Sequence, residues 1–401
     1  MSTTRALLVS SCALISALLW ACESAGRTPD PEREETAGLS NSVTAADDGP
    51  RLASPFLEAE RCALCHSRAP RARALTTATG EDASPFATWQ ATLMANSFRD
   101  PYWRAQMAHE VEQRPEERAE IEGLCLRCHA PLTHHAARLA GEPQPALFDL
   151  VANPLALEGV SCTACHRTQA AGLGSEASFD GRLPILDEPA IFGPFPEPAQ
   201  GPMNMHTGYT PTYGEHISSS ALCGACHTLR TTHAPGAEPF VEQSPYLEWR
   251  NSSFSSEGPA GRTEGTRECQ ECHMPDMGDM KIARNPRGLD FNIETRRGVR
   301  AHTFVGGNAL MLDLLRENAE AFGVEAPAAA LERLAQATRA QLAHSTAELS
   351  IGGVRRAGTT LAFDVEVVNL TGHKLPTGYP SRRAWLSVEV RAGNDTVFSS
   401  G

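Results

Sequence analysis

Cys162-Thr163-Ala164-Cys165-His166 lies in a chain of 401 residues, and its pattern, C-x-x-C-H, occurs four more times. The other pentads are Cys62-Ala63-Leu64-Cys65-His66, Cys125-Leu126-Arg127-Cys128-His129, Cys223-Gly224-Ala225-Cys226-His227 and Cys269-Gln270-Glu271-Cys272-His273. Such a pentad is typical of c-type haem attachment, in which both thiols form thioethers and the histidine becomes the proximal iron ligand. Five pentads therefore predict five covalently bound haem c groups.

This interpretation assigns two sets of site residues. The predicted thioether residues are Cys62, Cys65, Cys125, Cys128, Cys162, Cys165, Cys223, Cys226, Cys269 and Cys272. The predicted proximal iron ligands are His66, His129, His166, His227 and His273.

C-x-x-C pairs also occur in zinc sites and in redox dithiols, so both alternatives need weighing. A zinc site does not require a histidine directly after every C-x-x-C pair. A structural zinc site also needs four converging ligands, and five identical half-sites cannot all pair off into such sites. Of the 12 cysteines, only Cys12 and Cys22 lie outside the pentads. The predicted mature chain thus has no cysteine to spare for a disulfide framework, which favours haem.

The N-terminus predicts export. Arg5 precedes an apolar run over 6–21, which is short for a membrane span of about 20 residues and fits a secretory signal. The run ends in Leu19-Trp20-Ala21-Cys22, which resembles the lipobox of bacterial lipoproteins and predicts lipidation of Cys22. Ordinary cleavage near Ala21, releasing a soluble periplasmic protein, is the alternative. We expect an exported, periplasmic or outer-membrane-associated lipoprotein of a Gram-negative bacterium, with no transmembrane helix in the mature chain.

Composition divides the rest of the chain. After the signal peptide (1–22), residues 23–55 are small and polar and predict a disordered linker. Residues 56–300 show little strand alternation and many prolines and glycines, which predicts a mainly α pentahaem cytochrome c domain with much irregular structure. Because aromatic residues are only 6% of the chain, we expect the haems to serve as the core and the apoprotein not to fold.

Two helical regions are predicted in detail. Asp100 as N-cap and Pro101 at the first position start a helix over 101–113. It has an apolar face around Trp103 and a second face with Tyr102 and His109, so we expect it to be sandwiched. Apolar spacing predicts a helical hairpin over 301–347, with helices at 308–322 and 327–346.

The last segment, 348–401, changes to alternating apolar residues around Leu361 and Val388, which predicts a small antiparallel β module resembling part of a sandwich. Only about four strands fit, which leaves an exposed sheet edge. Either the chain is truncated or another element covers that edge.

A bis-histidine haem also needs a distal histidine, and nine of the 14 histidines lie outside the pentads. His109 and His216 are the first candidates, the former for its helical position and the latter for its place shortly before Cys223. The further candidates are His134, His135, His206, His302 and, as a rival to His302, His373. Each histidine taken singly could equally be a surface or core residue.

Beyond the pentads, several strings carry a resemblance: Trp89-Gln90-Ala91-Thr92-Leu93-Met94, Arg99-Asp100-Pro101, Glu158-Gly159-Val160-Ser161, Met274-Pro275, His302-Thr303-Phe304-Val305-Gly306-Gly307-Asn308 and Gly372-His373-Lys374-Leu375-Pro376-Thr377-Gly378. With them the chain resembles the multihaem c-type cytochromes related to hydroxylamine oxidoreductase and to the small tetrahaem cytochrome that receives its electrons. That group contains both electron carriers and enzymes. The chain has fewer pentads than hydroxylamine oxidoreductase and lacks the C-x-x-C-K pentad of ammonia-forming nitrite reductase.

These observations favour an electron carrier with redox partner proteins, in a respiratory or extracellular electron-transfer chain. The alternative is a reductase or oxidase acting on a small nitrogen or sulfur oxyanion at one open-coordinate haem. A third reading makes the C-terminal strands a docking module. The net charge of −13 argues against nucleic acid as a partner.

Overall fold

The computed structural model describes residues 55–232 and 236–401. The predicted signal peptide, Cys22 and the predicted linker up to residue 54 lie outside these residues. Within them, none of the helices is both long and apolar enough to cross a membrane.

Helix and strand make up about 35% and 17% of the structure, so the fold is mixed rather than mainly α as predicted. Most strand residues belong to four two-stranded sheets. The strands are β1 (Ala190–Gly193), β2 (Thr210–Tyr213), β3 (Leu229–Thr231), β4 (Phe240–Gln243), β5 (Ala347–Ala357), β6 (Thr360–Asn369), β7 (Val388–Ala392) and β8 (Asp395–Ser400). The sheets β1–β2 and β3–β4 escaped prediction because strands this short carry too few residues to show an alternating pattern.

The helices of the pentad region are short, and they carry or flank the pentads. They are α1 (Ala59–His66), α2 (Pro85–Trp89), α3 (Pro101–Gln113), α4 (Arg118–His129), α5 (Pro131–Ala140), α6 (Leu147–Leu150), α7 (Pro154–Leu157), α8 (Cys162–His166), α9 (Gln200–Thr207), α10 (Ser220–Gly224), α11 (Pro245–Arg250) and α12 (Cys269–His273), with 3-10 turns η1 (Pro115–Glu117) and η2 (Glu215–Ser218). Helical spacing places two residues three apart on one side of a turn, so both thiols of a pentad can face the same haem.

Helix α3 begins as predicted, because the Asp100 carboxylate accepts hydrogen bonds from the backbone N–H groups of Tyr102 and Trp103 at 2.8 and 3.1 Å. Trp103 is buried on one face, but Tyr102 and His109 on the opposite face are exposed. Tyr102 nevertheless lines the cavity described below, so the expectation that this helix is sandwiched stays a prediction.

Two polar clusters tie distant pentads into the fold. The Glu268 carboxylate accepts hydrogen bonds from the backbone N–H and the hydroxyl of Ser220, at 2.9 and 2.6 Å, and so joins α10 to the start of α12. The Arg284 guanidinium donates to the carbonyls of Leu64 and Ser67 at the end of α1. The first and fifth pentads are thus held by residues far from them in sequence.

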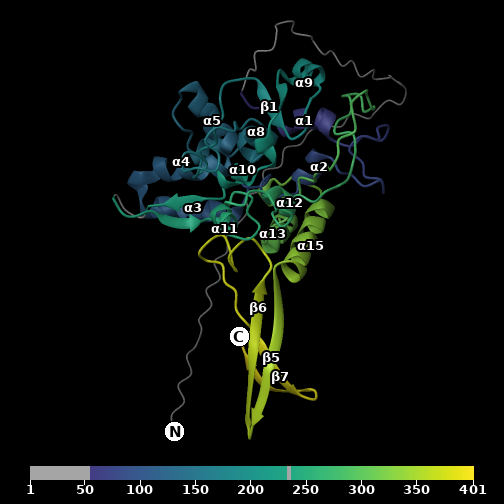
Figure 1. Cartoon of the computed structure of the whole chain (residues 1–401). Helices are drawn as coiled ribbons and strands as arrows, with labels where there is room; N and C mark the ends of the chain where they lie inside the picture. Colours follow the sequence, from purple (N-terminus) through teal and green to yellow (C-terminus); the bar gives the residue numbers. More distant parts are fainter. Residues whose placement is uncertain (1–54, 233–235) are drawn as a thin grey trace, which may run out of the picture. The chain divides into compact units, whose positions relative to one another are not determined.

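The helical hairpin is present, with α13 (Ala309–Glu317), α14 (Ala319–Phe322) and α15 (Ala328–His344). Helices α13 and α15 lie side by side (Figure 1), and their contact buries Leu312, Leu331 and Leu334. Leu310 and Leu342 on the same two helices are exposed and line the cavity described below.

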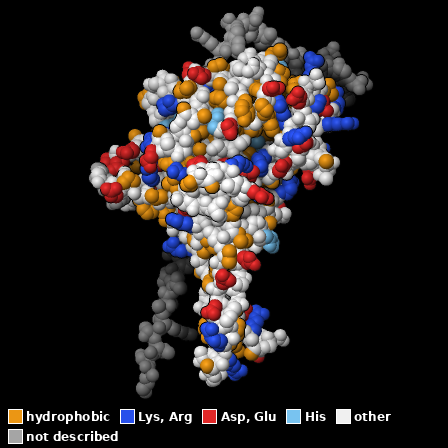
Figure 2. Space-filling model, viewed as in Figure 1, with side chains coloured by type: hydrophobic (Ala, Val, Ile, Leu, Met, Phe, Trp, Pro, Cys, Tyr) orange, Lys and Arg blue, Asp and Glu red, His pale blue; other side chains and the backbone are white. Residues whose placement is uncertain are grey.

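The C-terminal strands are antiparallel, as predicted. In β5–β6 the register pairs Leu349 with Val367 and Ile351 with Val365, which gathers apolar side chains on one face. Strands β7 and β8 form a separate two-stranded sheet. Leu349 and Ile351 remain exposed, and Figure 2 shows hydrophobic and charged side chains together on this part of the surface.

Candidate haem cavity

All five pentads open into one connected cavity of about 2470 Å³. Ordinary small-molecule pockets measure ~300–1,000 Å³, so this space suits several large ligands. Every pentad histidine lines it, as does every pentad cysteine except Cys272, which is exposed. The ten cysteines are free thiols. Apolar walls and free thiols fit a large flat cofactor attached through sulfur.

Four of the five pentad histidines are oriented by the same contact. In each, Nδ1 donates to a backbone carbonyl: His66 to Ile282 at 2.9 Å, His129 to Ser97 at 2.9 Å, His166 to Phe192 at 2.6 Å and His273 to Val305 at 2.5 Å. A metal-binding imidazole commonly donates its second nitrogen in this way, which fixes the ring and leaves Nε2 with its lone pair. These four rings therefore have the orientation that a metal-binding imidazole needs.

Desolvation favours the neutral form of four pentad imidazoles, those of His66, His129, His166 and His227. Desolvation lowers the pKa of His129 to about 4 and also lowers that of His66 and His166. Desolvation likewise lowers the pKa of His227 to about 4, although no carbonyl contact orients its ring. Only a neutral imidazole can donate a lone pair to a metal, so the cavity favours the ligating form.

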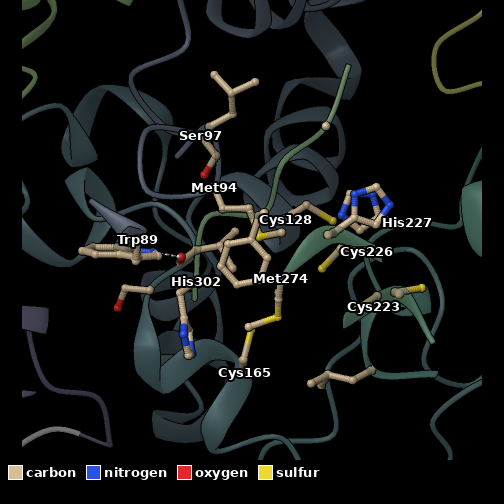
Figure 3. Close-up of a pocket in the computed structure, with 18 of the residues that line it drawn as sticks. Trp89, Met94, Ser97, Cys128, Cys165, Cys223, Cys226, His227, Met274 and His302 are labelled. Carbon is tan, nitrogen blue, oxygen red and sulfur yellow. Dashed lines mark hydrogen bonds between the residues drawn. The ribbon is translucent and has the colours of Figure 1, made fainter. Parts of the chain in front are cut away.

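The thiols of different pentads meet in pairs. The thiols of Cys62 and Cys162, of Cys223 and Cys269, and of Cys226 and Cys128 lie close enough to shift each other's pKa. Figure 3 shows Cys128, Cys165 and Cys226 around the same part of the cavity, and Cys226 contributes to raising the pKa of Cys165 to about 12, after burial. The first pentad thus lies beside the third, the fourth beside the second and fifth, and the third approaches the fourth.

Two candidate distal histidines face pentad histidines across the cavity. The ring of His302 lies opposite that of His166, with centres 6.3 Å apart and planes 27° apart. The ring of His373 lies opposite that of His273, with centres 6.2 Å apart and planes 34° apart. Both are held by Nδ1, His302 by the Arg300 carbonyl at 3.2 Å and His373 by the Pro245 carbonyl at 3.1 Å.

These separations match a shared metal. Bonds of about 1.33 Å place each imidazole nitrogen ~1.1 Å from its ring centre, and metal–imidazole bonds are about 2.0–2.1 Å long. Two imidazoles on opposite sides of one iron should therefore have ring centres about 6.3 Å apart. Direct contact between stacked rings would bring them closer, as in the Trp103–His129 pair at 4.2 Å. The gap between each histidine pair has the size of one coordinated iron.

The other candidates differ in placement. His206 lines the cavity, and its carbonyl accepts a hydrogen bond from Arg61 beside the first pentad. His134 and His135 are buried on α5, where Nδ1 of His134 and Nε2 of His135 have no hydrogen-bond partner. Neither lines the cavity, and among the described residues no group of three or more ligands that includes them could hold a metal ion.

The structure does not bring the two first candidates to the cavity. His109 is exposed on α3, opposite the buried Trp103 face. His216 is absent from the cavity wall, and its Nε2 contacts the Thr168 carbonyl at 2.9 Å while its ring edge packs toward Gly214. Their role as ligands stays a prediction that this geometry does not support.

Sequence reasoning missed the supporting residues of the site. Trp103 stacks on His129 with planes 4° apart, and Trp89 donates from Nε1 to the Val160 carbonyl at 2.8 Å, the contact drawn in Figure 3. Backbone carbonyls orient the histidines, and a carbonyl carries no residue signature. The sequence did carry a signal for Trp89, because this residue belongs to one of the strings on which the family resemblance rests.

Zinc would need a group of converging ligands. In residues 55–232 and 236–401, no group of three or more His, Cys, Asp or Glu side chains is arranged to hold a metal ion by itself. Two pentad histidines, His166 and His273, instead each face a second histidine across open space, as an iron held within a porphyrin requires.

Comparison with known proteins gives one match. Residues 61–167, which contain the first three pentads, match the family model described as cytochrome c554 and c-prime. No curated protein and no solved structure matches the chain. The match does not bear on a link to hydroxylamine oxidoreductase. It supports a multihaem c-type cytochrome, with covalently bound haem c and a role in electron transfer.

Proposed function

We propose that this chain is an exported pentahaem c-type cytochrome that carries electrons in a respiratory or extracellular electron-transfer chain. The observation that carries the proposal is the contact between thiols of different pentads within one cavity. A thioether joins each sulfur to the edge of a porphyrin, so sulfurs in contact bring two haem edges together. Electrons could then pass from haem to haem.

The thiol contacts also suggest an order. The first haem would neighbour the third, the third would approach the fourth, and the fourth would contact both the second and the fifth. This order differs from the order of pentads in the sequence. An electron entering at the first haem would therefore reach a branch point at the fourth.

For the axial ligands we assign His302 to the third haem and His373 to the fifth. The support is the ring separation of 6.3 and 6.2 Å in these two pairs. Bound haem supplies an iron that alternates between ferric and ferrous states. The protein's part is to hold each imidazole, and the carbonyls at Nδ1 make the rings stronger donors, which favours ferric iron.

We further propose export through the signal at 1–22 and lipid attachment at Cys22, with redox partner proteins outside the cytoplasm. These residues lie outside the described part of the chain, so the support is the sequence pattern alone. Palmitate labelling of the protein and of a Cys22→Ala variant would test the attachment. Equal labelling of the two would contradict it.

The haem count is tested by a haem stain and intact mass, combined with spin-state spectroscopy. Five covalent haems, with low-spin spectra for those that have two histidine ligands, would support the proposal. A mass that corresponds to unmodified protein, from cells able to mature c-type cytochromes, would refute it.

One observation favours the second candidate function, a reductase or oxidase at an open haem. Among the described residues, no histidine ring faces His129 as His302 faces His166. Tyr379 and Arg382 line the cavity instead, and Tyr379 lies near Cys128. Turnover of nitrite, hydroxylamine or tetrathionate with an artificial electron donor, lost in Arg382→Gln, would support this function over simple electron transfer.

A further inference from the structure

Glu158 stands between the first and third pentads. Its Oε1 accepts a hydrogen bond from the backbone N–H of Ala59, at the start of α1, at 2.5 Å. Its charge acts on both Cys62 and Cys162, whose thiols are in contact. The carboxyl therefore lies where the edges of two haems would meet.

The position of this carboxyl is fixed on both sides. Gly159 has a φ of +56°, and a Cβ there would lie 2.5 Å from the Met94 carbonyl oxygen. Val160 donates to the same carbonyl at 2.9 Å. Because only glycine fits this close turn, the backbone holds Glu158 against α1 with little freedom to move.

The second carboxyl oxygen is the unusual feature. Oε2 of Glu158 is buried and no donor meets it in good hydrogen-bond geometry, although the Ser161 hydroxyl and Glu60 lie close by. The charged groups around the carboxyl are Glu60 on α1 and Arg99 after α2, and the facing thiols are Cys62 and Cys162. An ionised carboxylate with one oxygen unpaired in a buried site is costly, which favours the protonated form.

This environment changes the pH at which the Glu158 carboxyl loses its proton. Burial raises the pKa of Glu158 to about 7, and the negative charge of Glu60 adds to the shift. The group thus changes charge near neutral pH. Glu60 is exposed and within hydrogen-bonding reach, so it connects the buried carboxyl to solvent.

We propose that Glu158 is a redox-linked proton site, which binds one proton from solvent when the haem pair of the first and third pentads gains one electron. This inference rests on the proposed function, because it requires haems at these pentads. The electron comes from a redox partner protein and reduces one ferric iron to ferrous. The proton binds Oε2, so the charge of the buried region stays unchanged.

The size of the coupling follows from electrostatics. One electron added roughly 10 Å away, at an effective dielectric constant of about 20, raises the proton affinity of a carboxylate roughly tenfold. Linkage makes the effect reciprocal, so protonation favours reduction by the same factor. The midpoint potential of this haem pair should therefore fall as pH rises through about 7.

The test is a spectroelectrochemical titration of the holoprotein on both sides of pH 7, with E158Q and, as control, E325Q. Glu325 also lies near Arg99 but is exposed and away from the pentad thiols. In the wild type and in E325Q, part of the haem absorbance should titrate at a potential that falls with pH. In E158Q the same part of the haem absorbance should titrate, at every pH, at the potential that the wild type shows on the acid side of pH 7. The reason is that glutamine stays neutral.

Infrared difference spectra give a second readout. Reduction of the wild type should produce a protonated-carboxyl band that shifts in deuterium oxide and is missing in E158Q. If E158Q does not assemble, E158D replaces it and should shift the band. Potentials independent of pH in a wild type that carries all its haems, or a band unchanged in the variant, overturn the inference. Absence of haem would overturn the proposed function instead.

Discussion

Removal of His302 should open one haem to solvent ligands. His302 faces His166 with ring centres 6.3 Å apart, and burial lowers its pKa to about 3, so its ring is neutral and able to bind iron at neutral pH. In His302→Ala, the third haem keeps His166 and loses its sixth ligand. We expect its ferric iron to change from low spin to high spin.

The magnitude follows from the number of haems. With the five haems proposed above, one iron of five should change, so about one-fifth of the haem should become high-spin while the rest keeps the wild-type spectrum. Electron paramagnetic resonance of the oxidised protein measures this fraction. Carbon monoxide binding to the reduced protein should rise by the same one haem equivalent, and added imidazole should restore the low-spin spectrum.

His109→Ala is the matched control, because His109 is an exposed histidine that the sequence alone ranked first. This variant should show no new high-spin signal. The reasoning would be refuted if His302→Ala retained all its low-spin haem and bound no additional carbon monoxide, or if His109→Ala produced the signal instead. Either result would mean that the ring separation does not report coordination.

Three further predictions concern other parts of the cavity. His373→Ala should open the fifth haem in the same way, seen as a separate high-spin signal, and an unchanged spectrum would remove this ligand from the assignment. Gly181→Ala should lose haem or stability, by about 1–3 kcal/mol beyond Gly172→Ala. Both glycines have positive φ, but only a Cβ at 181 would lie 2.9 Å from the Cys128 sulfur, and equal denaturation midpoints would contradict this. The raised pKa of Glu158 contributes stability that is present below about 4.5 and lost as pH rises through about 7, so E158Q should become more stable than wild type across that range, by up to ~3 kcal/mol, in denaturant titrations.

Local sequence predicted α3 and the helical hairpin well. The N-cap Asp100 and the following proline placed the start of α3 correctly, and the helical hairpin appeared near its expected bounds. These signals depend on residues within one turn of each other, so they are present before the chain folds. The sheets β1–β2 and β3–β4 lacked such a signal, since each forms between short segments that pair only after folding.

The distal histidines show the limit of local reasoning. Helical placement and nearness to a pentad favoured His109 and His216, yet the ring facing His166 belongs to His302, and the ring facing His273 belongs to His373. Distance along the chain says little about which side chains meet across a cavity. The burial of Glu158 was equally beyond local reasoning, because Glu158 comes to lie beside Cys62 only when α1 packs against the start of α8.

By itself, the sequence determined the five pentads and the residues within each that can hold a haem, because that chemistry needs only five consecutive residues on a helical turn. The tertiary structure decided which thiols meet, which carbonyls orient four of the proximal rings and which histidines stand opposite two of them. Some of these contacts join residues more than a hundred positions apart, as in His166 and His302. They exist only when the chain has folded around the cavity.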